Sequence, residues 1–342
     1  MRFSTKKSVV MLFWGVMLSN NVGAAESLTE VEIEADKPLF SILVNKHSRS
    51  QLITSNAVWA EGPLCLPDGS VLFSDVKQNK VMIWSEKQGL KEWLSPSDFQ
   101  NCHALDLQGR VIAASHGKRA LLRQNKDGSW EILADAWQGK PLNSPNDVTI
   151  APDGAIWFTD PTFGVLNKKE SYGGTPEQGG EFIYRYDTVS KTLSRLNAPE
   201  THSPNGLAFS ADGKRLYVAD SEQAHDFNNT ALAEHIISYR VSNNRLLDGK
   251  VFAEIPVGIP DGIKVDEKGN VWSSSKEGVR IYSSEGLMLG RILIPSENTG
   301  NLALCTDASK HKWLYVTAAN LVLRLPVLVN GGSPTQNFAV SR

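Results

Sequence analysis

The stretch Pro67-Asp68-Gly69-Ser70-Val71-Leu72-Phe73-Ser74-Asp75 decides the fold, because it combines a tight turn with a short apolar strand and because the chain repeats it. Asp-Gly before an apolar run predicts a β-hairpin, since glycine accepts the positive φ that a primed turn requires. The further copies are Asp106–Ser115, Pro152–Asp160, Asp212–Asp220, Glu267–Ser275 and, in degraded form, Asp307–Thr317.

The spacing of these copies predicts the architecture. Repeats of about 40 to 50 residues that contain only short strands are typical of four-stranded propeller blades. A second strand pair follows most copies, as in Lys80–Trp84 and Glu181–Tyr186. Six copies therefore predict an all-β fold, a six-bladed β-propeller, and we expect a strand near Leu39–Leu43 or Ser50–Thr54 to close the sixth blade.

Composition excludes several classes of protein. The 342 residues include 41% hydrophobic and 21% charged residues, which is typical of globular proteins rather than of disordered or fibrous ones. With 35 Lys+Arg against 37 Asp+Glu, the chain lacks the basic surface that nucleic-acid binding needs. No glycine-rich loop follows a strand and opens a helix, so nucleotide binding is unsupported.

Residues 1–24 have the layout of a secretory signal peptide. Three cations (Arg2, Lys6 and Lys7) precede the apolar run Ser8–Leu18, and Val22-Gly23-Ala24 provides small residues for cleavage. The run is shorter than the roughly 20 residues of a membrane span, so we expect no membrane insertion after cleavage. Residues 25–342 would then form one secreted, periplasmic propeller domain.

The three cysteines, Cys65, Cys102 and Cys305, are odd in number and far apart. A Cys65–Cys305 disulfide is conceivable if the chain closes into a ring, but we expect buried free thiols. Two blades also carry extra length, Thr162–Gly180 and Ser221–Glu234. Inserts of this kind are often functional loops, and we expect the first to act as a lid.

Oxygen-bearing side chains recur at the start of the predicted innermost strands, where separate blades meet at the axis. The four that we select as candidate metal ligands are Glu61, Asn146, Asn205 and Asp261. Two carboxylates and two amide oxygens suit Ca²⁺, with Mg²⁺, Mn²⁺ or Zn²⁺ as alternatives, although zinc prefers His and Cys. The alternative is ordinary turn chemistry, because Asn and Asp tolerate left-handed φ, but Glu61 has no such preference.

Two further residues are candidates for substrate binding. His116 and Arg119 lie in His116-Gly-Lys-Arg119, just after a predicted strand; His116 could shuttle protons and Arg119 could contact a hydroxyl or carboxylate of a bound substrate. A hydrogen-bonded loop histidine and a solvated surface arginine are the alternatives. Ser144 and Ser203 precede proline and lack a nucleophile elbow, so a serine triad is not expected.

The ordered motifs resemble the gluconolactonase-like family, which groups senescence marker protein (regucalcin), gluconolactonases and luciferin-regenerating enzyme. The motifs that carry this resemblance are Glu61-Gly-Pro63, Ser144-Pro-Asn-Asp147, Trp157–Pro161, Ser203-Pro-Asn-Gly206 and Pro260-Asp-Gly262. The resemblance implies a divalent metal in the channel and lactone hydrolysis. By position it implies Glu61, Asn205 and Asp261 as ligands, Asn146 as a ligand or substrate contact, and Asp147 near the substrate.

Together with the candidate ligands, this resemblance implies a metal-dependent hydrolase that opens a sugar lactone of the gluconolactone type by attack of water. A cation beside the carbonyl would stabilise the developing negative charge, and a carboxylate would take the proton. Asp261 is the first candidate for this base and Asp147 the second. Two alternatives remain: a non-catalytic binding scaffold with a structural calcium ion, and a phosphotriesterase-type hydrolase on the same site.

Overall fold

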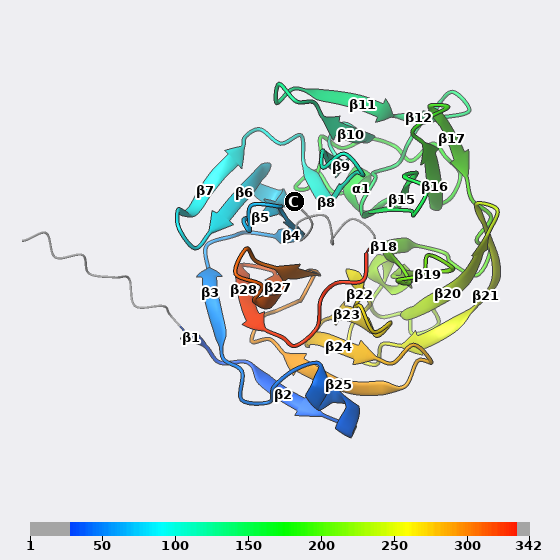
Figure 1. Cartoon of the computed structure of the whole chain (residues 1–342). Coiled ribbons are helices and arrows are strands. Elements are labelled where there is room, and N and C mark those ends of the chain that lie inside the picture. Colours follow the sequence, from blue (N-terminus) through cyan, green and yellow to red (C-terminus); the bar gives the residue numbers. More distant parts are fainter. Residues whose placement is uncertain (1–27, 334–342) are drawn as a thin grey trace, which may run out of the picture.

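Six antiparallel sheets form a ring of blades around a central axis (Figure 1). The computed structural model describes residues 28–333, so the predicted signal peptide lies outside the described residues. The six-bladed prediction is confirmed. Within residues 28–333 no helix has the length and apolar character that a membrane crossing requires.

The first three blades run in chain order, each from its innermost to its outermost strand. The first contains β4 (Ala60–Cys65), β5 (Val71–Asp75), β6 (Lys80–Ser85) and β7 (Gly89–Leu94). The second contains β8 (Gln100–Leu105), β9 (Val111–Ser115), β10 (Ala120–Gln124) and β11 (Trp130–Ala134). A two-stranded ribbon of β12 (Ala136–Trp137) and β13 (Lys140–Pro141) precedes the third blade. The third blade contains β14 (Val148–Ile150), β15 (Ile156–Asp160), β16 (Phe182–Asp187) and β17 (Thr192–Arg195).

The last three blades complete the ring. The fourth contains β18 (Pro204–Phe209), β19 (Arg215–Asp220), β20 (His235–Ser242) and β21 (Arg245–Glu254). The fifth contains β22 (Ile263–Val265), β23 (Val271–Ser275), β24 (Gly278–Tyr282) and β25 (Met288–Leu293). The sixth contains β26 (Asn301–Thr306), β27 (Lys312–Ala318) and β28 (Leu321–Pro326).

The N-terminal segment closes the ring. Strand β3 (Ser50–Thr54) pairs with β28 and itself pairs with β1 (Leu28–Thr29), which confirms the second of the two predicted closing segments. The other prediction is wrong, because Leu39–Leu43 lies mostly within the 3-10 helix η1 (Pro38–Ile42). Strand β2 (Glu32–Ala35) adds a fifth strand to the fifth blade through β25.

The repeated turn differs slightly from the predicted primed type. Gly69 has the expected positive φ of 84°, but Leu66 and Ser70 pair across a three-residue loop, and Gly69 N–H donates to Leu66 O. This is a turn followed by a left-handed glycine, the next most common hairpin geometry. Asp68 accepts a hydrogen bond from Ser70 N–H at 3.0 Å, which explains why the turn carries Asp.

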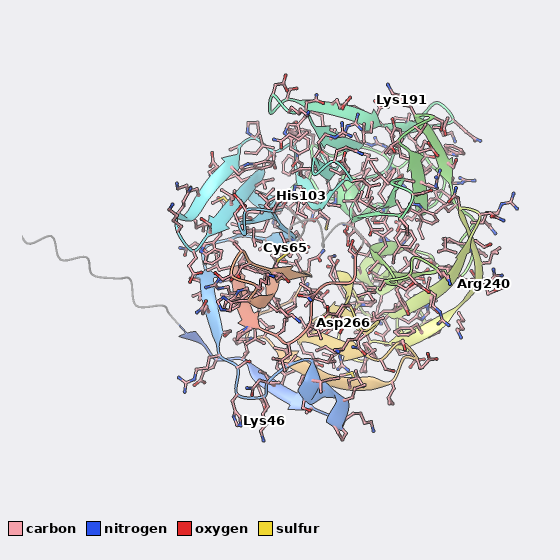
Figure 2. All side chains as sticks on the ribbon, viewed as in Figure 1. Lys46, Cys65, His103, Lys191, Arg240 and Asp266 are labelled. Atoms are coloured by element: carbon pink, nitrogen blue, oxygen red, sulfur yellow. A yellow bond between two sulfur atoms is a disulfide. The ribbon has the colours of Figure 1, made fainter. Side chains whose placement is uncertain are left out.

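The core lies between neighbouring blades rather than at the axis. A separate cluster of buried apolar residues fills each of the six blade interfaces. Aromatic pairs join adjacent blades, such as Trp157 with Phe209, whose rings are 5.2 Å apart and nearly perpendicular. Because sheet faces supply the stabilising contacts, the channel ends are available for polar residues. Figure 2 shows the side chains, with His103 and Cys65 on inner strands and Lys191 and Arg240 at the periphery.

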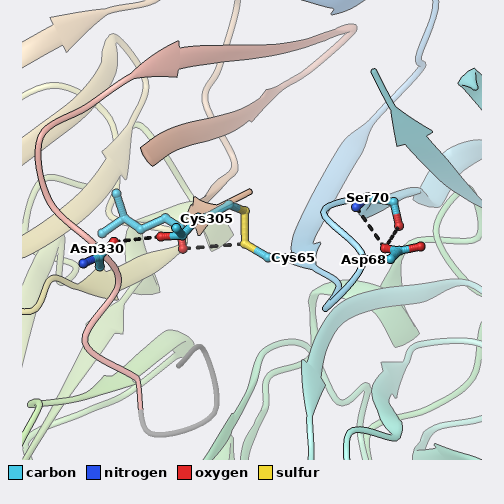
Figure 3. Close-up of a disulfide and its surroundings, with 7 residues drawn as sticks. Cys65, Asp68, Ser70, Cys305 and Asn330 are labelled. Atoms are coloured by element: carbon cyan, nitrogen blue, oxygen red, sulfur yellow. Dashed lines mark hydrogen bonds between the residues drawn. A yellow bond between two sulfur atoms is a disulfide. The ribbon is translucent and has the colours of Figure 1, made fainter. Parts of the chain in front are cut away.

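A disulfide joins the first and last blades. Cys65 at the end of β4 and Cys305 in β26 are bonded, with their Cα atoms 5.6 Å apart (Figure 3). Our expectation of free thiols is therefore wrong for these two residues, because ring closure places their strands next to each other. Cys102 is free and buried.

Candidate active site

The four predicted ligand residues line one cavity of about 860 Å³ at one end of the channel. Glu61 and Asn205 are the second residues of β4 and β18. Asn146 and Asp261 lie just before β14 and β22. The structure therefore brings side chains from four separate blades together at the axis.

Irregular pairing at the start of the inner strands positions these residues. The register of β4 against β5 shifts between Glu61 and Leu64, and that of β18 against β19 shifts between Pro204 and Leu207. A bulge of this kind re-aims a side chain and is common beside active sites. The backbone freed by the shift bonds to the next blade instead, as Gly206 N–H donates to Asp261 O at 3.1 Å.

Close backbone approach, and not left-handed turn geometry, explains Gly206, Gly262 and Gly300, whereas Gly62 after Glu61 has a positive φ of 52°. Neither Asn205 nor Asp261 has a positive φ, and neither do the glycines that follow them. A Cβ on Gly206 would lie 2.0 Å from Asp261 O, and one on Gly300 would lie 2.1 Å from Glu61 Oε1. The alternative of ordinary left-handed turn chemistry therefore fails at these positions, since the glycines are required by space.

The two candidate carboxylates repel each other in a buried setting. Burial raises the pKa of Glu61 well above its usual range, and the charge of Asp261 raises it further. Burial raises the pKa of Asp261 to about 8, and the charges of Asp147 and Glu170 add to the rise. Paired carboxylates with such shifts favour a bound proton or a bound cation.

The donor set fits a hard divalent cation. Asn205 Oδ1 is buried and accepts no hydrogen bond from the described residues. Within residues 28–333 no three or more His, Cys, Asp or Glu side chains are grouped to hold a metal ion, so a metal site here would need oxygen ligands besides the two carboxylates, such as side-chain amides, backbone carbonyls or water. Two carboxylates with amide oxygens are the ligands that Ca²⁺ accepts in irregular geometry, whereas Zn²⁺ usually takes nitrogen or sulfur.

Asp147 occupies a different place from Asp261. It is buried and does not line the large cavity, whereas Asp261 does. Its Oδ1 accepts a hydrogen bond from Val148 N–H at 2.7 Å, and its Oδ2 lies 3.9 Å from Lys264 Nζ. Lys264 lines the small cavity at the opposite end of the channel. Asp147 therefore lies deeper in the channel, between the carboxylates and a lysine that sequence reasoning missed.

His116 lies behind the site rather than on its surface. Its Nε2 is 3.1 Å from Asn101 Nδ2 and 3.4 Å from Asn146 Nδ2. Burial lowers the pKa of His116 to about 4, so the ring is neutral near neutral pH and can accept from both amides. Both amide oxygens are then turned away from the ring. Gly164 packs directly against this imidazole.

Arg119 fastens the first insert instead of facing the cavity. Its Nε donates to Leu142 O at 2.6 Å, and its second guanidinium nitrogen, Nη2, donates to Thr175 O at 3.2 Å. The structure thus gives the guanidinium internal partners on the insert and the preceding loop. Substrate contacts by His116 and Arg119 stay predictions, and neither residue lines the large cavity.

Both predicted inserts contribute to the cavity. The first contains α1 (Phe163–Leu166), and the second contains the 3-10 helix η3 (Glu222–His225). The rings of Phe163 and His225 stack with centroids 4.9 Å apart, so the inserts meet at the cavity wall. The 3-10 helix η2 (Val76–Gln78) follows β5 in the first blade. It places Lys77 Nζ 3.3 Å from Oε1 of Glu170, which belongs to the first insert.

Sequence reasoning also missed several polar residues of this cavity, among them Asn101 and Glu170. Asn101 is the second residue of β8, the position that Glu61 and Asn205 hold in their own strands. This shared position, the second residue of an innermost strand, was the signal that could have identified Asn101. Glu170 lies in an insert, where no repeat defines its place.

The motif order and the site geometry agree with a comparison against protein families. The family model described as SMP-30/Gluconolactonase/LRE-like region matches residues 59–320. The chain belongs to the SMP-30/gluconolactonase/LRE-like family.

The chain is also similar in sequence to named enzymes and to solved structures. The gluconolactonase of Zymomonas mobilis is 28% identical over 317 residues, which cover 84% of each protein. The L-arabinolactonase of Azospirillum brasilense is 29% identical, covering 72% of this chain and 79% of that protein. A crystallised gluconolactonase of Xanthomonas campestris is 31% identical, covers 89% of this chain and 97% of its own, and has a TM-score of 0.80.

Proposed function

We propose that the protein hydrolyses a lactone, and that its substrate is a sugar lactone of the gluconolactone type. The observation that carries the proposal is the convergence of Glu61 and Asp261, with buried amide oxygens, on one cavity. Family relatives named gluconolactonase and L-arabinolactonase support the reaction class. Net hydrolysis adds water to the carbonyl carbon, breaks the ring C–O bond and gives a hydroxy acid.

We assign a divalent cation, Ca²⁺ in the first place, to Glu61, Asn146, Asn205 and Asp261. When bound, it would supply Lewis-acid polarisation of the lactone carbonyl. The carboxylates provide the charge that balances such an ion. His116 holds the amides of Asn101 and Asn146 so that their oxygens face away from its ring.

Asp261 is the better placed of the two candidate bases. It lines the cavity, while Asp147 is buried behind it and already contacts Val148 N–H. A general base must reach the proton of the attacking water within hydrogen-bond distance. We therefore assign proton removal to Asp261, and we assign Asp147 to balancing the charge of Lys264.

The test is a proton-release assay with a panel of lactones that includes glucono-1,5-lactone and L-arabinono-1,4-lactone. Hydrolysis should be abolished by a chelator and restored by added Ca²⁺, with Mg²⁺, Mn²⁺ and Zn²⁺ tested in parallel. Turnover that persists unchanged in chelator contradicts metal dependence. Absence of turnover for every lactone and every metal contradicts the proposed reaction.

We also propose export to an oxidising compartment, such as the periplasm. The layout of residues 1–24 and the Cys65–Cys305 disulfide support it, since structural disulfides persist in oxidising compartments. Fractionation of cells that produce the full chain tests this proposal. Recovery of the full-length, reduced chain in the cytosolic fraction would contradict it.

A further inference from the structure

Two exposed apolar side chains stand at the mouth of the large cavity. Leu166, at the end of α1, is 60% exposed, and Phe227, just after η3, is 62% exposed. They come from different inserts, yet both line the same cavity, together with Phe163 and Ile259. We call these four residues the apolar wall. Exposed apolar residues scattered singly need no explanation, but apolar groups gathered at a binding cavity mark a ligand surface.

Anchored segments carry the apolar wall. The ring of Phe163 stacks on His225, whose Nε2 lies 3.1 Å from Glu181 Oε1 and 3.0 Å from Ser203 Oγ. Gly164 N–H donates to Ser144 Oγ at 3.1 Å, and Gly164 O accepts from Ser171 Oγ at 2.7 Å. These contacts hold Phe163 and the two inserts that carry Leu166 and Phe227 against the inner strands.

The cavity is polar at its base and apolar at this wall. Its volume of about 860 Å³ lies within the range of sites for drug-sized ligands, which is more than a single sugar ring fills. A polyhydroxylated lactone can satisfy the carboxylates and amides but leaves Leu166 and Phe227 in water. An alkyl or aryl substituent on the lactone ring would cover them, and each buried methylene raises affinity about fourfold.

We infer that the site accepts a second class of substrate, lactones whose ring carries an apolar substituent, and that the apolar wall binds this substituent. The inference rests on the proposed function. The bond changes are the same: the water oxygen bonds to the carbonyl carbon, the ring C–O bond breaks, and the ring oxygen takes a proton. The product is a hydroxy acid that keeps the substituent.

The experiment compares kcat/KM for γ-nonalactone and for glucono-1,5-lactone. The test protein carries Leu166→Ser and Phe227→Ser, and the control carries Ile132→Ser and Leu287→Ser, two residues that are each 53% exposed and lie outside the cavity. We expect the nonalactone-to-gluconolactone ratio to fall at least tenfold in the test protein and to stay within twofold in the control. An unchanged ratio, or an equal fall in the control, overturns the inference.

A binding measurement separates this inference from the proposed function. The ligand 2-pentyltetrahydrofuran keeps the ring and the alkyl chain but has no carbonyl, so it cannot be hydrolysed. Calorimetry should show binding to the wild-type chain that weakens at least tenfold with Leu166→Ser and Phe227→Ser. If no lactone is hydrolysed but this difference in affinity is observed, the proposed reaction is wrong and binding of the alkyl group by the apolar wall is supported. Equal affinity for both proteins contradicts binding by the apolar wall.

Discussion

The two ends of the central channel are built in opposite ways. At one end, Glu61 and Asp261 face a cavity of about 860 Å³ with raised pKa values, so this end is electrostatically unfavourable without a cation. At the other end, a cavity of about 90 Å³ is flanked by the Cys65–Cys305 disulfide. The segment after β28 lines this cavity. Its Gly332 N–H donates to Val265 O, and its Asn330 Oδ1 accepts a hydrogen bond from Thr306 Oγ1.

This contrast shows that the residues proposed to bind ligands and the residues that stabilise the fold lie at opposite ends of the channel. Polar groups that lack partners accumulate at functional sites, whereas well-satisfied contacts stabilise the fold elsewhere. Asp266 illustrates the second kind: it is buried near the small cavity and accepts from Trp272 Nε1 at 3.0 Å and from Asn270. Substitutions at the two ends should therefore have opposite consequences for activity and stability.

The largest expected effect is on turnover at the large cavity. Asp261→Asn should lower kcat by about a thousandfold or more, because it removes both a ligand charge and the proposed base. It should leave the melting temperature of the metal-free protein equal or higher, since a repelling carboxylate is gone. Lactone kinetics and thermal unfolding in chelator check both outcomes.

Asp266→Asn is the matched control from the other end. It should lower stability by about 1–3 kcal/mol, because the amide cannot accept all the hydrogen bonds that the carboxylate accepts. Turnover of the folded protein should stay within twofold. If Asp261→Asn destabilises as much as Asp266→Asn, the proposed difference between the ends is wrong.

The second effect is on stability at the small cavity. Replacing Cys65 and Cys305 together by Ala removes the covalent link between the first and last blades, and a lost native disulfide costs about 2–5 kcal/mol. We expect denaturant unfolding to move to lower concentration by that amount, with kcat/KM changed less than threefold at 25 °C. A selective loss of metal affinity would show that the disulfide also organises the site.

The smallest effect concerns pH. The pKa of Asp261, about 8 in the folded chain against an ordinary 3.8, means that ionising it costs stability in the metal-free protein as pH rises from about 4 through 8. A divalent cation needs the ionised form, so its apparent affinity should rise with pH, by up to about tenfold per unit below pH 8 for Asp261 alone and more steeply where Glu61, whose pKa is also raised, must lose its proton.

Melting temperatures with Ca²⁺ and with chelator, measured at pH 6 and pH 8, test this dependence. The increase produced by Ca²⁺ should be a few degrees larger at pH 8. Asp266→Asn should keep the trend, because Asp266 lies outside the large cavity. An increase that is equal at both pH values would place the ion away from Asp261.

Repetition made much of the fold and part of the site predictable. The Asp-Gly turns and alternating strands specify six blades, and the equivalent positions along the inner strands identify Glu61 and Asn205. Asn101 holds the same position in its strand, but it follows Gln100 and not a proline as Asn146 and Asn205 do, so it was not selected. The Cys65–Cys305 disulfide was named as an alternative but not favoured, because pairing across 240 residues depends on ring closure rather than on any local signal.

The sequence by itself determined the kind of blade, the number of blades and the chemical character of the residues that face the axis, since these follow from local turn and strand preferences. Only the tertiary structure decided which groups meet. It placed Asp147 against Lys264, His116 behind two amides, and the two inserts on one cavity. The reason is physical: contacts between residues of different blades depend on how six sheets pack face to face, and no short stretch of chain encodes the distance between two such residues.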